Sequence, residues 1–174
     1  MRLRLVWLVV FLLLPASARA SDHTASLFGA LSFASGSTLS GLHGSVEVSW
    51  PTSHPLHDYF AIIIDGSAYG GEHDSDSVTR ATFLVGGRGL YRFPRTNQVV
   101  SGEVLLGVVR SHTSAGKDNN FGLAIGGGYE YLLGDADPQT SPQGWGVRFQ
   151  SDYVFQNSGD GFARASAGVI YRFK

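Results

Sequence analysis

Two side chains near the middle of the chain have the types and the spacing of a nucleophile and its base. His112 and Ser114 are separated by a single threonine. A histidine beside a serine can act as general base and activate the hydroxyl for attack on an acyl group. Such i, i+2 pairs are also common by chance, and we favour the interpretation that this is a plain polar loop.

Two other segments carry side chains that bind cations. The segment 54–58 (HPLHD) spaces two imidazoles in a way that suits Zn²⁺, and the segment 72–76 (EHDSD) offers hard oxygens for Ca²⁺. Neither contains a complete ligand set, and the two are expected at opposite ends of the fold, so they cannot form one site. We therefore predict solvated loop charge here, with no metal and no cofactor.

Charged residues also recur at alternate positions of otherwise apolar segments. In a β-strand, alternate residues share a face, so these segments have one apolar and one polar face. Arginines in mid-strand would be strongly destabilised in lipid but are accommodated inside a barrel, where carboxylates can pair with them. The sequence leaves the pairing open, but it predicts a lumen lined by Glu47, Asp65, Arg88, Arg92, Glu103, Glu130, Arg148, Asp152, Arg164 and Arg172.

The alternation defines eight candidate strands separated by stretches rich in Gly, Ser, Asp, Asn, Pro or His. We place them at 26–35, 41–50, 59–69, 78–93, 99–112, 121–132, 145–156 and 161–173. The glycines at 126–128 lie inside one such segment, with neither Lys-Ser/Thr nor a helix after them, so they do not form a phosphate-binding loop. Aromatic residues near the strand ends, Tyr69 among them, are expected at two membrane interfaces.

The N-terminal residues have the features of a secretory signal peptide. Arg2 and Arg4 precede an apolar run too short to span a bilayer, and Ala18-Arg19-Ala20 supplies a cleavage site. We predict a signal peptide over 1–20, cleaved after Ala20, and one domain over 21–174. Without the leader, 10 basic residues face 14 acidic ones and no basic block remains, which argues against nucleic acid as a partner. An exported chain with no cysteine has no disulfide framework.

The last strand carries the most specific signal. In the segment 161–173 (GFARASAGVIYRF), Ser166, Gly168, Tyr171 and Phe173 follow the pattern polar-x-Gly-x-x-aromatic-x-aromatic. This resembles the C-terminal assembly signal of bacterial outer-membrane barrels, although Lys174 follows the final aromatic. With the strand count and the GGGYEY segment at 126–131, the chain resembles the small OmpA/OmpX-type outer-membrane β-barrel family.

The resemblance implies an all-β fold: an eight-stranded antiparallel up-and-down transmembrane β-barrel preceded by a cleaved signal peptide. It also implies an outer-membrane location, lipid and lipopolysaccharide as surroundings, and insertion by the barrel-assembly machinery. Both termini would be periplasmic, so that the loops 36–40, 70–77, 113–120 and 157–160 face outward. The periplasmic connections 51–58 and 134–144 are long for this family.

The function expected from the resemblance is structural or surface-interacting, as in envelope integrity or adhesion, and non-catalytic. Because the interior of eight strands is just wide enough for side chains, an open porin is not expected. Two alternatives stay open. His112 and Ser114 resemble the His-x-Ser of outer-membrane lipid A deacylases, although Ala115 replaces the Asn of that family; alternatively, a secreted lipocalin-like carrier would enclose an apolar cavity.

Overall fold

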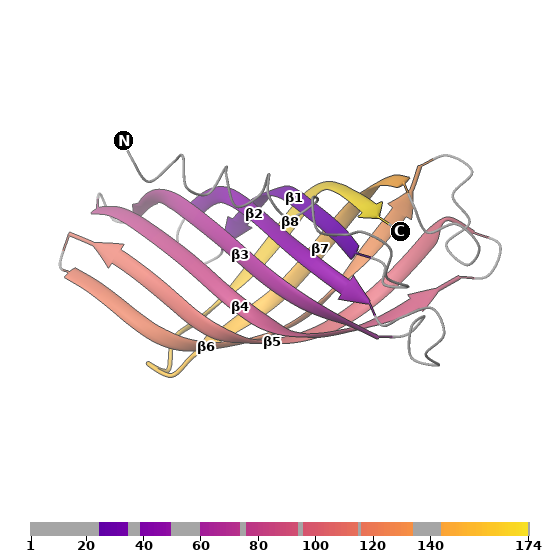
Figure 1. The fold of residues 1–174 in the computed structure, drawn as a ribbon. Helices are drawn as coiled ribbons and strands as arrows, with labels where there is room; N and C mark the ends of the chain where they lie inside the picture. Colours follow the sequence, from indigo (N-terminus) through magenta and orange to yellow (C-terminus); the bar gives the residue numbers. More distant parts are fainter. Residues whose placement is uncertain are drawn as a thin grey trace.

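The computed structural model describes residues 25–34, 39–49, 60–73, 76–93, 96–114, 116–133 and 144–173. These ranges form one closed barrel of tilted strands (Figure 1). In chain order the strands are β1 (Ala25–Ala34), β2 (Leu39–Ser49), β3 (Phe60–His73), β4 (Asp76–Arg92), β5 (Gln98–Thr113), β6 (Gly116–Leu132), β7 (Gly144–Gln156) and β8 (Gly161–Phe173). The predicted segment 1–20 and the connection 51–58 lie outside the described residues.

Each strand pairs antiparallel with the next, and the last strand returns to the first. The pairing of β8 with β1 runs from Ala25 opposite Phe173 to Ala34 opposite Arg164. With eight strands, the chain enters and leaves at the same end of the barrel. We call the opposite end, where β1–β2, β3–β4, β5–β6 and β7–β8 are joined, the hairpin end. The predicted fold class, an eight-stranded antiparallel up-and-down barrel, is confirmed.

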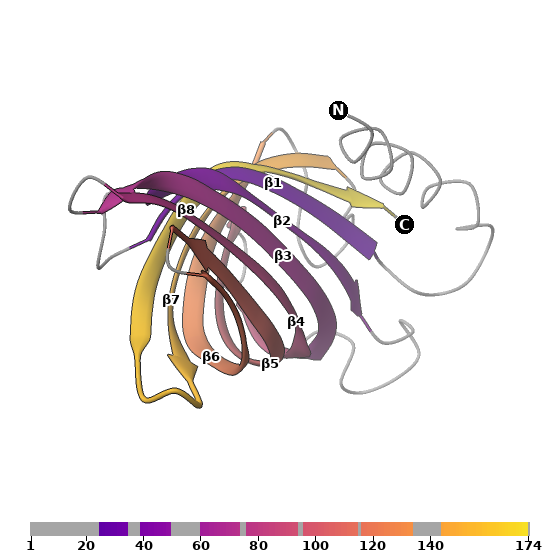
Figure 2. The same ribbon diagram turned by 90° about the vertical axis from the view of Figure 1, so that its left-hand side faces the viewer.

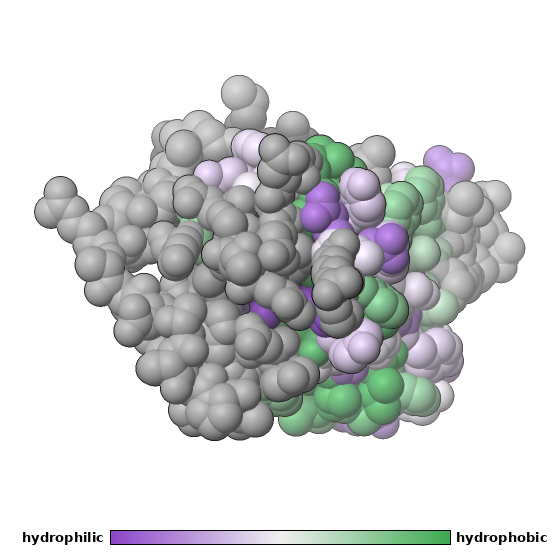
Figure 3. Space-filling model, turned by 90° about the vertical axis from the view of Figure 1, so that its right-hand side faces the viewer, coloured by the Kyte–Doolittle hydropathy of each residue, from purple (hydrophilic) through white to green (hydrophobic). Residues whose placement is uncertain are grey.

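The alternation of each strand separates the outer wall from the lumen. Three consecutive isoleucines illustrate this: Ile62 and Ile64 are 46% and 47% exposed on the outer wall, whereas Ile63 between them is fully buried. The same parity exposes large apolar side chains on every strand from β1 to β8, among them Phe33, Leu42, Phe83, Leu106, Ile125, Phe149 and Val169. Where Figure 3 shows the barrel wall, hydrophobic residues gather along its outer side. Within the described ranges, no helix is long and apolar enough to cross a membrane.

The interior is less uniformly polar than the alternation suggests. An apolar cluster fills the hairpin end of the lumen, with Tyr69, Val109 and Phe162 among its members, and a smaller one of Ala61, Leu90 and Val99 lies towards the other end. The prediction that Tyr69 lies at a membrane interface is wrong, because its side chain is 2% exposed and faces inward. The lumen therefore contains apolar clusters as well as charged side chains.

The hairpins β3–β4 and β5–β6 are longer than predicted. The expected loops 70–77 and 113–120 are mostly strand, since His73 pairs with Asp76 and Thr113 with Gly116. In Figures 1 and 2 these two hairpins project from the hairpin end. Of the four expected loops, the connection 157–160 keeps its predicted extent. The expected loop 36–40 does not, because β2 already begins at Leu39. The segments expected as loops are polar because they are strands that extend beyond the apolar belt. A polar composition shows that a segment is exposed, but it does not show that its backbone is irregular.

The outer wall generates a first prediction, made on one strand and one face. Val85→Arg places a charge inside the apolar belt, whereas Thr79→Arg places it beyond the belt at the hairpin end. In lipid, we expect Val85→Arg to lower the free energy of unfolding by about 2 to 4 kcal/mol and Thr79→Arg by about 0 to 1 kcal/mol. Urea unfolding in phospholipid vesicles measures both, and equal effects would show that lipid does not contact this wall.

Candidate functional site

The middle of the lumen is occupied by a network of ion pairs. Arg88 on β4 is fully buried, and its Nε and Nη2 atoms donate to Glu103 Oε2 on β5 at 2.8 and 2.5 Å. Its Nη1 atom donates to Glu47 Oε2 on β2 at 2.7 Å. The Arg88 guanidinium thus pairs with carboxylates from two other strands. β5 is adjacent to β4 in the sheet, whereas β2 is not.

Two further arginines complete this central cluster. Arg148 Nη2 lies 3.0 Å from Glu47 Oε2 and 2.5 Å from Glu130 Oε1, and its Cζ atom is 5.0 Å from the centre of the Phe28 ring. Arg172 Nη2 donates to the other oxygen of Glu130. The central cluster therefore contains three arginines and three glutamates, so its formal charges balance.

A second cluster lies next to it and is built around Arg164. Its Nε donates to Asp152 and its Nη1 donates to Asp65 Oδ1 at 2.7 Å. The other oxygen of Asp65 lies 2.5 Å from His43 Nε2, and His43 Nδ1 lies 2.8 Å from Ser166 Oγ. Arg164 thus joins two aspartates from different strands, and His43 links one of them to Ser166 on β8.

Gln150 connects the two clusters. Its Nε2 atom donates to Glu103 Oε1 at 2.6 Å and to Asp152 Oδ2 at 3.3 Å, while its Oε1 accepts from Arg88 Nη2 at 2.9 Å. The joined network contains side chains from every strand from β2 to β8. Because an eight-stranded interior is only wide enough for side chains, this network and the apolar clusters fill the lumen.

All ten residues predicted to line the lumen are buried inside the barrel. Nine of them belong to the network just described, and Arg92 is buried as well. The sequence reasoning did not single out His43 or the role of Ser166 in holding its ring. The signal for His43 was present, because it has the same parity on β2 as Ser45 and Glu47, which also face inward.

Ser166, His43 and Asp65 are hydrogen-bonded in the order of a serine hydrolase triad. Their surroundings do not suit that chemistry. Ser166 is 6% exposed and points into the lumen, and Arg164 neutralises the aspartate that would orient the histidine. A nucleophile must reach its substrate, so this arrangement fastens strands together instead of forming an active site.

The other chemical candidates lie on the outside. His112 and Ser114 are both exposed at the tip of the β5–β6 hairpin, and neither makes a side-chain hydrogen bond within the described part of the chain. Among the described residues, no group of three or more His, Asp or Glu could hold a metal ion. The segment 54–58 lies outside those residues, as does Asp74 of the second candidate.

The four residues of the C-terminal pattern fall on both faces of β8. Ser166 points inward, whereas Tyr171 and Phe173 pack on each other on the outer wall with ring centres 4.6 Å apart. Trp145 on β7 packs on Tyr171 with ring centres 4.8 Å apart and planes tilted by 59°. Gly168 lies between Ser166 and Tyr171 along β8 and is paired with Arg148 on β7. The aromatic pair thus extends an aromatic cluster at the end where the chain terminates.

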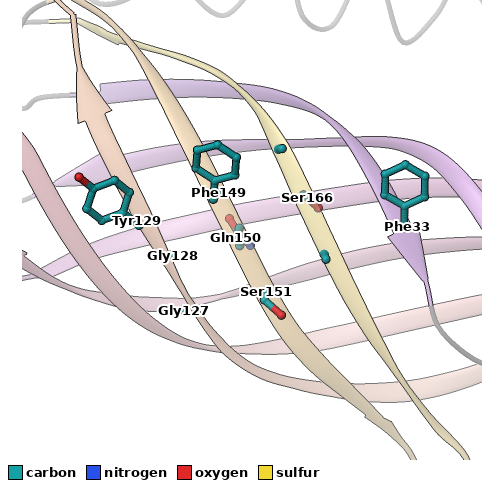
Figure 4. Close-up of a pocket in the computed structure, with 10 residues that line it drawn as sticks. Phe33, Gly127, Gly128, Tyr129, Phe149, Gln150, Ser151 and Ser166 are labelled. Atoms are coloured by element: carbon teal, nitrogen blue, oxygen red, sulfur yellow. The ribbon is translucent and has the colours of Figure 1, made fainter.

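A shallow groove of about 490 Å³ lies on the wall over β6, β7, β8 and β1 (Figure 4). Its sides are aromatic, from Phe33, Tyr129 and Phe149, and its floor includes small residues such as Gly127 and Ala165. The three rings point away from the strands in Figure 4, while Gln150 and Ser166 turn towards the lumen. The groove therefore belongs to the apolar exterior and does not open into the ion network.

An apolar outer wall, a closed eight-stranded sheet and an ion-paired lumen define the fold of the small outer-membrane β-barrels. Solved structures agree. Neisserial surface protein A is 16% identical with a TM-score of 0.56, covering 88% of this chain and 98% of that one. The Ail protein of Yersinia pestis is 14% identical with a TM-score of 0.56, covering 87% and 97%. The N-terminal barrel of Pseudomonas aeruginosa OprF is 14% identical with a TM-score of 0.53, covering 88% and 98%. At these identities the likeness shows the fold alone; no protein-family model and no curated protein matches the sequence.

The network generates a second prediction. Glu103→Gln keeps the shape of the side chain but leaves Arg88 with one carboxylate partner fewer in a buried site. We expect the free energy of unfolding to fall by about 3 to 5 kcal/mol, because an uncompensated buried charge is the main penalty. The matched control is Asp118→Asn, which removes an exposed carboxylate and should change stability by less than about 0.5 kcal/mol. Equal effects in urea titrations would contradict the burial of this charge pair.

Proposed function

We propose that the protein is an integral outer-membrane barrel with a non-catalytic structural or surface-interaction role in the cell envelope. The observation that carries this proposal is the division of each strand into an apolar outer face and an inner face closed by ion pairs. A wall that exposes rings and branched aliphatic chains on all sides suits hydrocarbon as its solvent. The filled lumen favours an anchor over a pore.

Export and insertion follow from the sequence in this proposal. Residues 1–20 would direct secretion and be cleaved after Ala20, leaving a mature barrel domain over 21–174. The pattern formed by Ser166, Gly168, Tyr171 and Phe173 would be read by the barrel-assembly machinery. The chain ends would then be periplasmic, with lipid and lipopolysaccharide around the wall and the hairpin end outside the cell.

The surface role rests on the two long hairpins. β3–β4 and β5–β6 extend past the apolar belt and carry polar side chains such as Glu72 and Asn119. Rigid strand pairs can present such side chains to a partner, as binding residues on a stable scaffold commonly do. Among the structural neighbours, Ail is an attachment invasion locus protein whose structure contains a heparin analogue. For this chain the extracellular partner is unknown, and no nucleic acid is expected.

The two alternative functions have distinct requirements. A hydrophobe carrier needs an apolar cavity, whereas the described lumen contains arginine and glutamate pairs. An acylhydrolase would need Ser114 as nucleophile and His112 as base. Release of an acyl chain from lipid A by the purified protein, abolished in Ser114→Ala, would overturn the non-catalytic proposal.

Fractionation and gel mobility test the proposal directly. We expect the protein to stay with the outer membrane through a carbonate wash and to migrate faster on a gel when unheated, because a closed barrel resists unfolding in detergent. Recovery in the soluble fraction would refute it.

Conductance in a planar bilayer tests the closed lumen. The wild-type barrel should show no large, stable channel, because the ion network and the apolar clusters occupy its interior. The variant Glu103→Gln, compared with Asp118→Asn, should be the one that shows opening events, since it removes a carboxylate from the centre of the network. A steady, porin-like conductance of the wild type would contradict the anchor role.

A further inference from the structure

The positive charges of the barrel are distributed unevenly between its two faces. Among the described residues, Arg88, Arg92, Arg148, Arg164 and Arg172 are buried in the lumen and Arg80 is half-buried. The exposed arginines and lysines of the described ranges are Arg110 and Lys117, and both lie on the β5–β6 hairpin. Neither forms an ion pair with another described residue.

The strand register brings these two cations together with a histidine. His112 is paired directly with Lys117, and Arg110 is paired with Asn119. Arg110 is therefore the diagonal neighbour of Lys117, at a Cβ separation of roughly 7 to 8 Å, and the same-face neighbour of His112. We call Arg110, His112 and Lys117 the basic patch.

The basic patch points sideways from the barrel. Val104, Leu106 and Val108 are exposed on β5 at alternate positions, and Arg110 and His112 continue that row on the same face. The register of β5 with β4 and with β6 is continuous along this stretch, so the parity does not change. The patch therefore continues the outer face of the wall towards the hairpin end and does not face the lumen.

Its height matches the headgroup layer of a membrane. A strand rises about 3.3 Å per residue, and a tilt near 45° leaves roughly 2.3 Å per residue along the membrane normal. Arg110 then lies about 5 Å above Val108, and the backbone of Lys117 lies about 9 Å above Phe121. The polar layer of each leaflet begins at the edge of the hydrocarbon and is about 5 to 8 Å deep. Arg110 therefore lies within this layer, whereas Lys117 starts just above it and its long side chain can reach down to it.

We propose that the basic patch is a docking site for the phosphate groups of a phosphorylated glycolipid in the leaflet that surrounds the hairpin end. The inference rests on the proposed outer-membrane location and adds a specific contact to it. Guanidinium and ammonium groups are the usual partners of phosphate, and the apolar row directly below would hold the acyl chains of the same molecule. A soluble anion has no acyl chains that could contact this apolar row.

Carboxylates near the patch do not cancel it. Asp118 follows Lys117 in sequence and therefore alternates to the other face of β6. Glu72 is exposed on the same side of the wall but belongs to β3, on the far side of β4 from the patch. The lateral surface of the hairpin is consequently positive where it would meet the leaflet.

The test measures lipid occupancy on the folded mature barrel in neutral detergent micelles by native mass spectrometry. The probes are bisphosphorylated lipid A, its dephosphorylated form, inorganic phosphate and sucrose octasulfate. We expect the wild type to prefer bisphosphorylated lipid A, and the double variant Arg110→Gln/Lys117→Gln to bind it roughly 25-fold more weakly, about 5-fold for each charge removed. The charge-preserving variant Arg110→Lys/Lys117→Arg should retain the preference.

Asp118→Asn, on the opposite face of the same hairpin, is the matched control and should not weaken binding. Equal occupancy by the two lipid A forms, or an unchanged affinity in the double variant, would overturn the inference. Equally tight binding of inorganic phosphate or of sucrose octasulfate would overturn the membrane source of the phosphate. Heat-modifiable mobility of each sample keeps the two proposals apart: a folded barrel without phosphate preference removes only this site, whereas a barrel that never folds in detergent removes the outer-membrane assignment as well.

Discussion

The pairing of the last strand with the first is the constraint on which the rest of the structure depends. Hydrocarbon offers no hydrogen bonds, so a strand edge left open in lipid would expose a row of unsatisfied amides and carbonyls. Closure between β8 and β1 removes both edges at once. It also fixes which alternate side chains point outward, because a closed sheet of this size has one small interior and one large exterior.

The charged lumen is better understood as a device for register than as a source of stability. Burying arginine and glutamate has a large desolvation penalty, and well-packed apolar residues often replace such pairs without loss. A slip of one residue in any pairing would, however, turn every inward side chain of that strand to the outside. With Arg164 held by Asp65 on β3 and Asp152 on β7, such a slip would place a guanidinium in hydrocarbon. The network thus makes the correct register much more stable than registers shifted by one residue.

The sequence was sufficient to predict the faces of the strands, and for a physical reason: parity has a period of two and needs no tertiary information. It therefore predicts Arg88 and Arg148 as lumen residues. It could not find their partners, because Arg164 and Asp65 are 99 residues apart and meet only once the barrel closes. The prediction for Tyr69 fails because it rests on a position near a strand end and not on parity, which places Tyr69 on the inward face of β3 with Asp65 and Ser67. His43 carries the same signal, since it shares the inward face of β2 with Ser45 and Glu47, but its partners Asp65 and Ser166 meet it only in the folded barrel.

The errors at the hairpins have a common origin in the polarity of edge strands. The pairing of β6 with β7 begins at Gly122, so the segment 116–120 of β6 extends past its neighbour with one side unpaired. An exposed edge outside the membrane would attract other strands, and natural edges are protected by charged side chains, lysine above all. Lys117 and Asp118 occupy this edge, and Asn120 contacts Gln156 where the edge meets β7. The polarity that suggests a loop is therefore what an ordered strand requires once it leaves the lipid. Within the described ranges it also places the exposed cations, Arg110 and Lys117, between the apolar wall and the tip of the β5–β6 hairpin.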